Sequence, residues 1–112
     1  MGFERFEVVR VPFPFTDRDP AKNRPALVLS DGATFNNPAG HSVMAMITSA
    51  VHASWPLDCA ISDLATAGLP APSVIRWKLF TLDHRLVRGT VGRLSGPDAA
   101  AAKIAMEHLL GL

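Results

Sequence analysis

Two short polar motifs in this chain adjoin apolar runs and together could hold a phosphate group. Arg24 stands just before the apolar residues 26–29, and a second apolar run, residues 43–47, leads directly into Thr48 and Ser49. Runs of this length and composition predict buried strands, so these polar side chains are expected where rigid strands begin or end. A guanidinium offers a planar fork of donors that matches phosphate oxygens. The pattern therefore predicts a site for a phosphate-containing ligand.

Each of these residues also has a purely structural interpretation. Arg24 could be a solvated loop residue, and Thr48 and Ser49 could satisfy backbone groups at a strand end, which is a common use of hydroxyls. Ser73 follows the proline-rich connector 69–72 and could simply cap it. It is the combination of an arginine with hydroxyls at strand ends that favours a site.

A second set of candidates lies in the middle of the chain. Arg76 and Lys78 are two residues apart on a predicted strand, so they share a face that could follow a nucleic-acid backbone or could simply face solvent. His52 and Trp55 lie in one predicted loop, where they could stack on a base or pack together. The sequence leaves both choices open.

Composition limits the class of protein. The 112 residues are 48% hydrophobic and 19% charged, which predicts one folded domain over residues 1–112. Nine prolines and eight glycines favour short strands and turns over a helix bundle. The net charge of only +1 argues against non-specific binding to polyanions, so any nucleic-acid contact must use a local patch.

Other chemistries find little support in the sequence. His41, His52, Cys59 and His84 do not fall at metal-ligand spacing, and we expect no metal and no cofactor. There is no glycine-flanked nucleophile and no phosphate-cradling glycine loop. The single cysteine cannot form an internal disulfide, and no signal segment or membrane-length apolar run is visible. These observations predict a cytoplasmic protein that does not enter a membrane.

The periodicity predicts several short strands and one long helix. The strands are expected over residues 6–15, 25–30, 42–48, 57–61, 73–77 with a continuation or bend to 82, and 87–94. Residues 16–23 and 31–41 are expected to be loops. Residues 62–67 are expected to form one helical turn, capped by Ser62 and ended by Gly68.

The final helix has the clearest start. Pro97 suits the first helical position, and Asp98 complements the helix dipole. Its apolar face is expected to pack on the sheet through Ala101, Ile104, Ala105, Leu109 and Leu112. A mainly β chain with a C-terminal helix predicts a small, strongly bent sheet or partly open barrel.

In their order, several segments resemble the MazF/PemK family of bacterial toxins. They are Val8 to Asp17 (VVRVPFPFTD), Asn23 to Ser30 (NRPALVLS), Ile47 to Ser49 (ITS), Gly68 to Arg76 (GLPAPSVIR), Thr81 to Asp83 (TLD) and Gly92 to Ser95 (GRLS). The resemblance implies an SH3-like, partly open β-barrel of the CcdB/PemK type and a homodimer. It also implies a type II toxin–antitoxin toxin that inhibits growth as a metal-independent endoribonuclease, an mRNA interferase, and binds a cognate antitoxin.

The resemblance also implies roles for particular residues. Arg24 and Thr48 match the positions most tied to cleavage of single-stranded RNA. Arg76 matches a further RNA-contacting arginine. We expect additional RNA contacts from Lys78, Ser49, Ser73, Lys22 and Asp17.

The expected chemistry uses the 2′-hydroxyl of RNA as the nucleophile, so the enzyme needs a proton acceptor, a proton donor and cationic stabilisation of a charged phosphate. Arg24 is expected to stabilise that charge and is also a candidate proton donor to the leaving oxygen. The products would be a 2′,3′-cyclic phosphate and a 5′-hydroxyl. Lys78 stands where some family members carry an acid. The sequence therefore leaves the general base open among Glu7, Asp17 and His41.

Two alternatives use the same barrel without RNA cleavage. A related toxin family poisons DNA gyrase, and here the apolar residues 108–112 at the end of the helix would provide the contact. The other alternative is a non-catalytic binding module. Under the main prediction, DNA is contacted only through an antitoxin complex.

Overall fold

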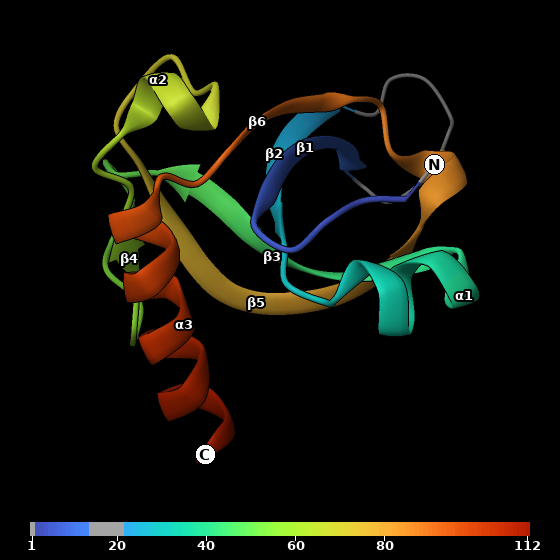
Figure 1. The fold of residues 1–112 in the computed structure, drawn as a ribbon. Coiled ribbons are helices and arrows are strands. Elements are labelled where there is room, and N and C mark those ends of the chain that lie inside the picture. The colour runs from blue at the N-terminus through green and yellow to red at the C-terminus, as the bar shows by residue number, and fades with distance from the viewer. Residues whose placement is uncertain (1, 14–21) are drawn as a thin grey trace.

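The computed structural model describes residues 2–13 and 22–112, which form one curled antiparallel sheet with helices along it (Figure 1). The six strands lie in the order β4-β5-β3-β2-β1-β6. Their bounds are β1 Glu7–Phe13, β2 Lys22–Val28, β3 His41–Ser49, β4 Cys59–Ala60, β5 Ser73–Asp83 and β6 Thr90–Arg93. The half-barrel with a C-terminal helix confirms the predicted fold class.

Five helical segments connect or follow these strands. They are η1 Gly32–Asn36, α1 Asn37–Ala39, α2 Leu64–Ala67, η2 His84–Leu86 and α3 Gly96–Leu110. Within the described ranges, none of these helices is both long enough and apolar enough to cross a membrane.

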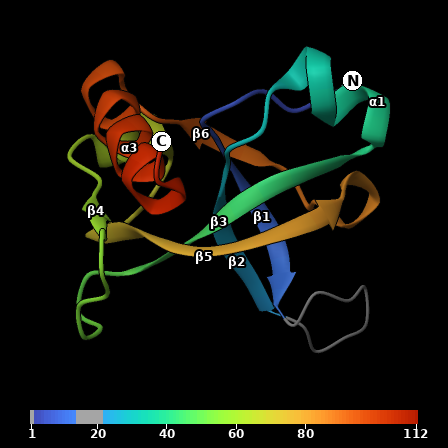
Figure 2. The ribbon, with the colours of Figure 1, turned by 90° about the horizontal axis from the view of Figure 1, so that it is seen from below.

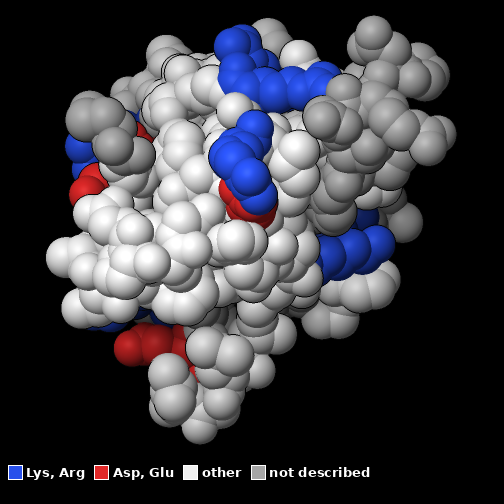
Figure 3. Space-filling model, turned by 90° about the vertical axis from the view of Figure 1, so that its right-hand side faces the viewer, with Lys and Arg blue, Asp and Glu red and all other residues white. Residues whose placement is uncertain are grey.

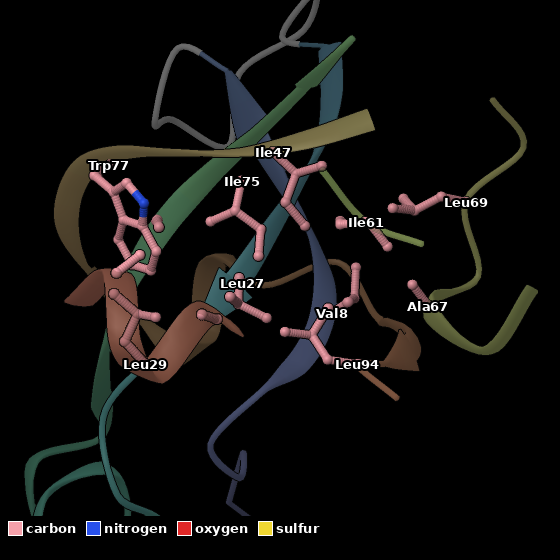
Figure 4. Close-up of a cluster of buried hydrophobic side chains, with 13 residues drawn as sticks. Val8, Leu27, Leu29, Ile47, Ile61, Ala67, Leu69, Ile75, Trp77 and Leu94 are labelled. Carbon is pink, nitrogen blue, oxygen red and sulfur yellow. The ribbon is translucent and has the colours of Figure 1, made fainter. Parts of the chain in front are cut away.

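The central strands bury side chains on both faces of the sheet, as the near-continuous apolar runs predict. On one face, Val8, Leu27 and Ile47 belong to a core that α2 and α3 close (Figure 4). On the other face, Val9 and Val28 belong to a second cluster, which the N-terminal segment and η2 cover. Burial on both faces fixes the strand register, since a slip of one residue would exchange the two faces.

Strand β5 both continues and bends. Ala45 of β3 pairs with Leu79, and the next residue, Met46, pairs with Arg76, so Trp77 and Lys78 form a bulge. A bulge bends a strand and increases its twist. Here the bend lets Trp77 enter the core, where its Nε1 donates to the carbonyl oxygen of Leu57 at 2.6 Å.

The prediction of a loop over residues 31–41 is wrong, because this segment forms η1 and α1. Asp31 starts the first turn by accepting from the backbone N–H of Thr34 at 2.9 Å. Asn36 is fully buried, and its Nδ2 donates to the carbonyl oxygens of Phe3 and Ser30. These side-chain hydrogen bonds stabilise a short helical segment that has no periodic hydrophobic pattern, so the sequence did not indicate a helix here.

Helix α2 occurs where predicted and ends at Gly68, but its cap is Asp63 and not Ser62. The Asp63 carboxylate accepts from the N–H of Thr66 at 3.0 Å. Ser62 instead donates through its backbone N–H and its hydroxyl to Asp98. The predicted cap was therefore wrong because Ser62 is bound by the start of another helix.

Helix α3 is capped by Ser95 and begins at Gly96, so Pro97 occupies the second helical position and not the first. Of its predicted apolar face, Ala105 is buried as expected, but Ala101, Ile104, Leu109 and Leu112 are exposed. The other buried residues are Asp98 and Ala102. The helix contacts β4 and β5, and its last turns extend beyond the sheet (Figures 1 and 2).

Several strand bounds also differ from the predictions. Strand β2 begins at Lys22, earlier than expected, and ends at Val28. Strand β6 covers Thr90–Arg93 and is shorter than the predicted 87–94. Before it, residues 84–86 form the turn η2, which Asp83 caps by accepting from the N–H of Arg85. Strand β4 keeps only two residues of the predicted 57–61. Residues 14 and 15, at the end of the first predicted strand, lie outside the described residues.

Candidate functional site

The candidate site lies where β2 and β3 part. Their ladder pairs Val28 with Met44, Leu27 with Ala45 and Ala26 with Met46, and then stops. Continuing the same register would place Pro25 opposite Ile47 and Arg24 opposite Thr48. Proline has no N–H to donate to a neighbouring strand, so the ladder cannot continue through it. The strands separate here and leave a pocket between them.

The pocket brings together four residues predicted from the sequence: Arg24, Thr48, Ser49 and Ser73. Its complete lining is Arg24, Pro25, Ile47, Thr48, Ser49, His52, Leu69, Pro70, Ala71, Pro72 and Ser73. Arg24 is exposed, as a cation that meets a ligand must be. The predicted cluster of an arginine and hydroxyls at strand ends is therefore present in the fold, where it can hydrogen-bond a phosphate.

The connector 69–72 forms the opposite wall of the pocket. The backbone N–H of Ala50 donates to the carbonyl oxygen of Pro72 at 3.0 Å. The Ser73 hydroxyl donates to the carbonyl oxygen of Ala71 at 2.8 Å, so Ser73 does cap the connector while lining the pocket. These two hydrogen bonds attach the connector to the end of β3 and the start of β5, and its two prolines restrict its backbone.

A second hollow lies on the other side of Arg24. Arg10, Asn23, Gly68 and Val91 line it, together with Arg24, Pro25, Leu69 and Pro70, which it shares with the first pocket. Arg10 was not predicted as a site residue. The strand alternation could have found it, because Arg10 stands between the buried Val9 and Val11. The two hollows share four lining residues, and we refer to them together as the groove; Arg10 and Arg24 are its two arginines.

His52 is the other site residue that the sequence did not single out as catalytic. It lines the first pocket, and its Nδ1 lies 3.5 Å from the Thr48 Oγ1, somewhat longer than the usual N–H···O hydrogen bond of about 2.7–3.2 Å. Its loop position carries no periodicity, so no sequence pattern could have placed it beside Thr48.

Arg76 does not line the pocket. Its Nη2 lies 2.8 Å from Oδ2 of Asp58, and its Nε lies 3.2 Å from Oδ1. This pairing lowers the pKa of Asp58 and raises the pKa of Arg76, chiefly through the hydrogen bonds between the two side chains. Lys78 lies with its Nζ 4.6 Å from the centre of the Trp55 ring. Both cations of the predicted basic face are thus engaged by the loop between β3 and β4.

The remaining candidates lie apart from the pocket lining. Lys22 is exposed at the start of β2, opposite Phe13. Glu7 accepts from the backbone N–H of Glu4, and His41 lies 3.9 Å from Asp83. Asp17 lies outside the described residues. In the ranges 2–13 and 22–112, no three His, Cys, Asp or Glu side chains are grouped to hold a metal ion.

The charged surface agrees with the small net charge. Figure 3 shows one face of the molecule, on which Lys and Arg side chains form separate patches among uncharged residues. An anionic ligand would therefore be recognised by local groups such as those of the groove, since this face offers no continuous basic field.

The curled six-stranded sheet and its C-terminal helix form a small half-barrel, with the arginine–threonine pocket where β2 and β3 separate. The family model for PemK-like, MazF-like toxins of type II toxin–antitoxin systems matches residues 4–110, and the chain belongs to this family. A search of curated proteins finds no match.

Solved structures with the same fold include toxins alone and in complexes. MazF (Form-I) from Deinococcus radiodurans is 22% identical with a TM-score of 0.74, covering 100% of this chain and 99% of that chain. An endoribonuclease in complex with its cognate antitoxin, from a mycobacterial species, is 18% identical with a TM-score of 0.73, covering 98% and 94%. Mycobacterium tuberculosis toxin MazF-mt6 is 20% identical with a TM-score of 0.72, covering 95% and 97%.

Proposed function

We propose that this protein is a metal-independent, sequence-selective endoribonuclease that cleaves single-stranded mRNA as the toxin of its toxin–antitoxin pair. The observation that carries the proposal is the meeting of Arg24 and Thr48 in one pocket, at the point where β2 and β3 separate. The family membership and the endoribonuclease named among the solved structures support the same activity.

The reaction would use the 2′-hydroxyl of the RNA itself. Its oxygen attacks the adjacent phosphorus, the bond from phosphorus to the 5′ oxygen breaks, and the products are a 2′,3′-cyclic phosphate and a 5′-hydroxyl. Arg24 stabilises the negative charge that gathers on the phosphoryl oxygens, and Thr48 orients the phosphate. Ser49 and Ser73 bind neighbouring parts of the strand.

The groove accounts for RNA binding beyond the reacting phosphate. Arg10 and Arg24 line its second hollow, so two guanidiniums can follow a backbone through the site. In this proposal Lys22, Lys78 and Arg76 act at the margins of the groove, and Asp17 contributes from the segment after β1.

In a type II toxin–antitoxin pair, the toxin is inhibited by its antitoxin protein. Structures of MazE–MazF from Deinococcus radiodurans contain a toxin with its antitoxin. We extend this to a cognate antitoxin for the present chain, to action as a cytoplasmic homodimer, and to DNA contact only through the antitoxin complex.

The test is incubation of purified protein with a long single-stranded RNA in EDTA. Wild-type protein is expected to give discrete fragments with 5′-hydroxyl ends, and Arg24→Ala is expected to give none. Arg85→Ala is the matched control, because Arg85 is an exposed arginine paired with Asp83 outside the groove. Intact RNA with excess wild-type protein would contradict the proposal.

A second candidate function is binding and poisoning of another protein, such as DNA gyrase. One observation favours it: α3 leaves Ile104, in its middle, and Leu110, at its end, more than half exposed, at 55% and 56%. Exposed apolar residues grouped on one helix are typical of a protein contact. Toxicity that survives Arg24→Ala but is lost on removal of residues 108–112 would favour this candidate.

A further inference from the structure

The proposed cleavage needs a group that accepts the proton of the 2′-hydroxyl. Arg24 is a permanent cation, and Thr48 and Ser49 carry hydroxyls, so none of them is a base near neutral pH. The described residues that line the pocket include no carboxylate. His52 is the one lining side chain with a nitrogen lone pair that can accept a proton.

We infer that His52 is the proton acceptor of the cleavage reaction, with Thr48 orienting its ring. This inference rests on the proposed ribonuclease function and supplies the base that the sequence left open among Glu7, Asp17 and His41.

The contact between the two side chains gives each a role. When Nδ1–H of His52 donates to Oγ1 of Thr48, 3.5 Å away, Nε2 of His52 keeps its lone pair. The Thr48 hydroxyl can then donate its own hydrogen to a non-bridging phosphate oxygen. The proton leaves O2′ for Nε2 of His52 as the bond from O2′ to phosphorus forms. The departing 5′ oxygen takes a proton from water, and the hydroxide so formed removes the proton from His52.

The loop that carries His52 is held in place on both sides. The backbone N–H of His52 donates to the carbonyl oxygen of Ser49 at 3.2 Å. On the other side, Nη2 of Arg76 donates to the carbonyl oxygen of Ala53 at 2.7 Å. Arg76 is therefore a positioning residue for His52 as well as the partner of Asp58.

The end of this loop is also fixed. Leu57 has a φ of 66°, which is uncommon for a residue other than glycine, and its carbonyl oxygen accepts from Trp77. The backbone N–H of Trp55 donates to Asp58. A loop with this many bonds to β5 can present an imidazole in one place, which proton transfer requires.

The charges around His52 come from a few elements. Arg24 of β2 shares the pocket with it, and β3 and the connector 69–72 contribute only uncharged lining residues. The charges of Asp58 and Arg76, near its own loop, are paired with each other. Arg24 is thus the charged group among the described residues that line the pocket.

The experiment measures single-turnover cleavage of a single-stranded RNA across about pH 5 to pH 8, for wild type, His52→Gln and His52→Ala. A general base contributes about 10²–10⁴-fold, so both variants should lose at least about 10²-fold in rate. The wild-type rate should rise with pH on the acid side, and this rise should flatten in His52→Gln. Added imidazole should restore part of the rate of His52→Ala.

Two controls separate catalysis from folding and binding. His108→Gln changes an exposed histidine on α3 and should match wild type. Both His52 variants should bind a fully 2′-O-methylated RNA, which cannot react, within about twofold of wild type, because a base acts on the reacting proton and not on binding.

The outcomes are distinct. If wild type cleaves and His52→Gln cleaves at the same rate with the same pH profile, the inference is overturned and the ribonuclease function stands. A loss of methylated-RNA binding equal to the loss of rate would also overturn it, since His52 would then be a binding residue. If wild type leaves RNA intact, both the function and the inference fail.

Discussion

The Arg76 guanidinium binds both carboxylate oxygens of Asp58 and, through Nη2, also holds the carbonyl oxygen of Ala53 2.7 Å away. One side chain of β5 therefore holds both the middle and the end of the loop between β3 and β4, residues 50–58. The bulge at Trp77 and Lys78 follows immediately, so the bend of the strand and the shape of the loop are set at the same place.

Breaking this pair should lower cleavage without touching the pocket lining. Asp58→Asn keeps the shape of the side chain but removes its charge and one acceptor, so the loop that carries His52 should lose its single position. Misplacement of a reacting group by about 1 Å can cost about 10²-fold, and we expect a loss of rate approaching that size. Single-turnover cleavage measures it. The control is Asp83→Asn, which breaks the exposed pair with Arg85 and should leave cleavage unchanged.

The close packing of α2 on β6 should be sensitive to a single methyl group. A Cβ added at Gly92 would lie 2.4 Å from the carbonyl oxygen of Thr66, so Gly92→Ala must push α2 away. Overpacking of this kind costs about 1–3 kcal/mol of unfolding free energy, which urea denaturation can measure. Since α2 leads through Gly68 into the connector, cleavage should fall as well.

The matched control is Gly96→Ala at the start of α3. A Cβ there meets nothing within 4 Å, and alanine favours a helix over glycine. We expect Gly96→Ala to be neutral or to stabilise the protein slightly. Equal stability of the two alanine variants would contradict the account of Gly92.

Asp98 should be a stabilising residue whose contribution depends on pH. Only 6% exposed, it accepts from the N–H and hydroxyl of Ser62 and from the N–H of Asp63. Burial raises its pKa, but these hydrogen bonds outweigh burial and the pKa is lowered. Asp98→Ala leaves these donors without their acceptor and should cost about 2–4 kcal/mol of unfolding free energy.

The sign of the pH effect follows from the lowered pKa. The carboxylate stabilises the fold above the unfolded-state pKa of about 4, and this contribution is lost as the pH falls through the lower folded-state pKa. Urea denaturation at a series of acidic pH values should therefore show a smaller loss for Asp98→Ala than for wild type. Parallel curves would mean that other carboxylates account for the acid sensitivity.

His84 should make the fold sensitive to mild acid. Its Nε2 lies 2.7 Å from the Ser42 hydroxyl oxygen, and the Phe3 ring packs edge-on against it. Burial lowers its pKa, nearby His41 lowers it further, and Asp83 opposes both. The unfolded chain, with a histidine pKa of about 6.5, binds the proton more readily, so stability should fall as the pH drops below that value.

The measurement is the melting temperature between about pH 7.5 and pH 5.5. His84→Gln, which can still bond Ser42 but cannot take up a proton, should lose less than wild type over this range. His108→Gln, on exposed α3, should follow wild type. The prediction fails if the His84 variant shows the wild-type slope.

The sequence predicted the central strands, and it placed Arg24 and Thr48 at strand ends, because both follow from local patterns. Alternation and apolar runs located the central strands, and Arg24 with Thr48 could be recognised from their places at strand ends. Arg24 and Thr48 share a pocket because Pro25 interrupts the hydrogen-bond ladder between β2 and β3. Proline has this effect wherever its missing N–H would face the neighbouring strand. Arg10 was accessible by the same alternation and was overlooked.

What the sequence did not predict depends on long-range contacts. From the sequence, Arg76 was interpreted as an unpaired cation, but it pairs with Asp58. Ser62 was interpreted as a helix cap, but its hydroxyl donates to Asp98. Of the apolar face predicted for α3, only Ala105 is buried, together with Asp98 and Ala102. His52 joins the site through a loop conformation that no residue pattern specifies.

The position of β1 between β2 and β6 has a consequence for the order of folding. Glu7 pairs with Arg93 and Val8 with Gly92. Strand β1 therefore pairs with β2, which follows it closely in the sequence, and with β6, which lies near the other end of the described residues. Folds dominated by such distant pairs form in milliseconds to seconds, more slowly than helical bundles. On the ribosome, Val8 and Leu27 therefore stay exposed until β6 and α3 have been synthesised, and the groove cannot take its final shape before then.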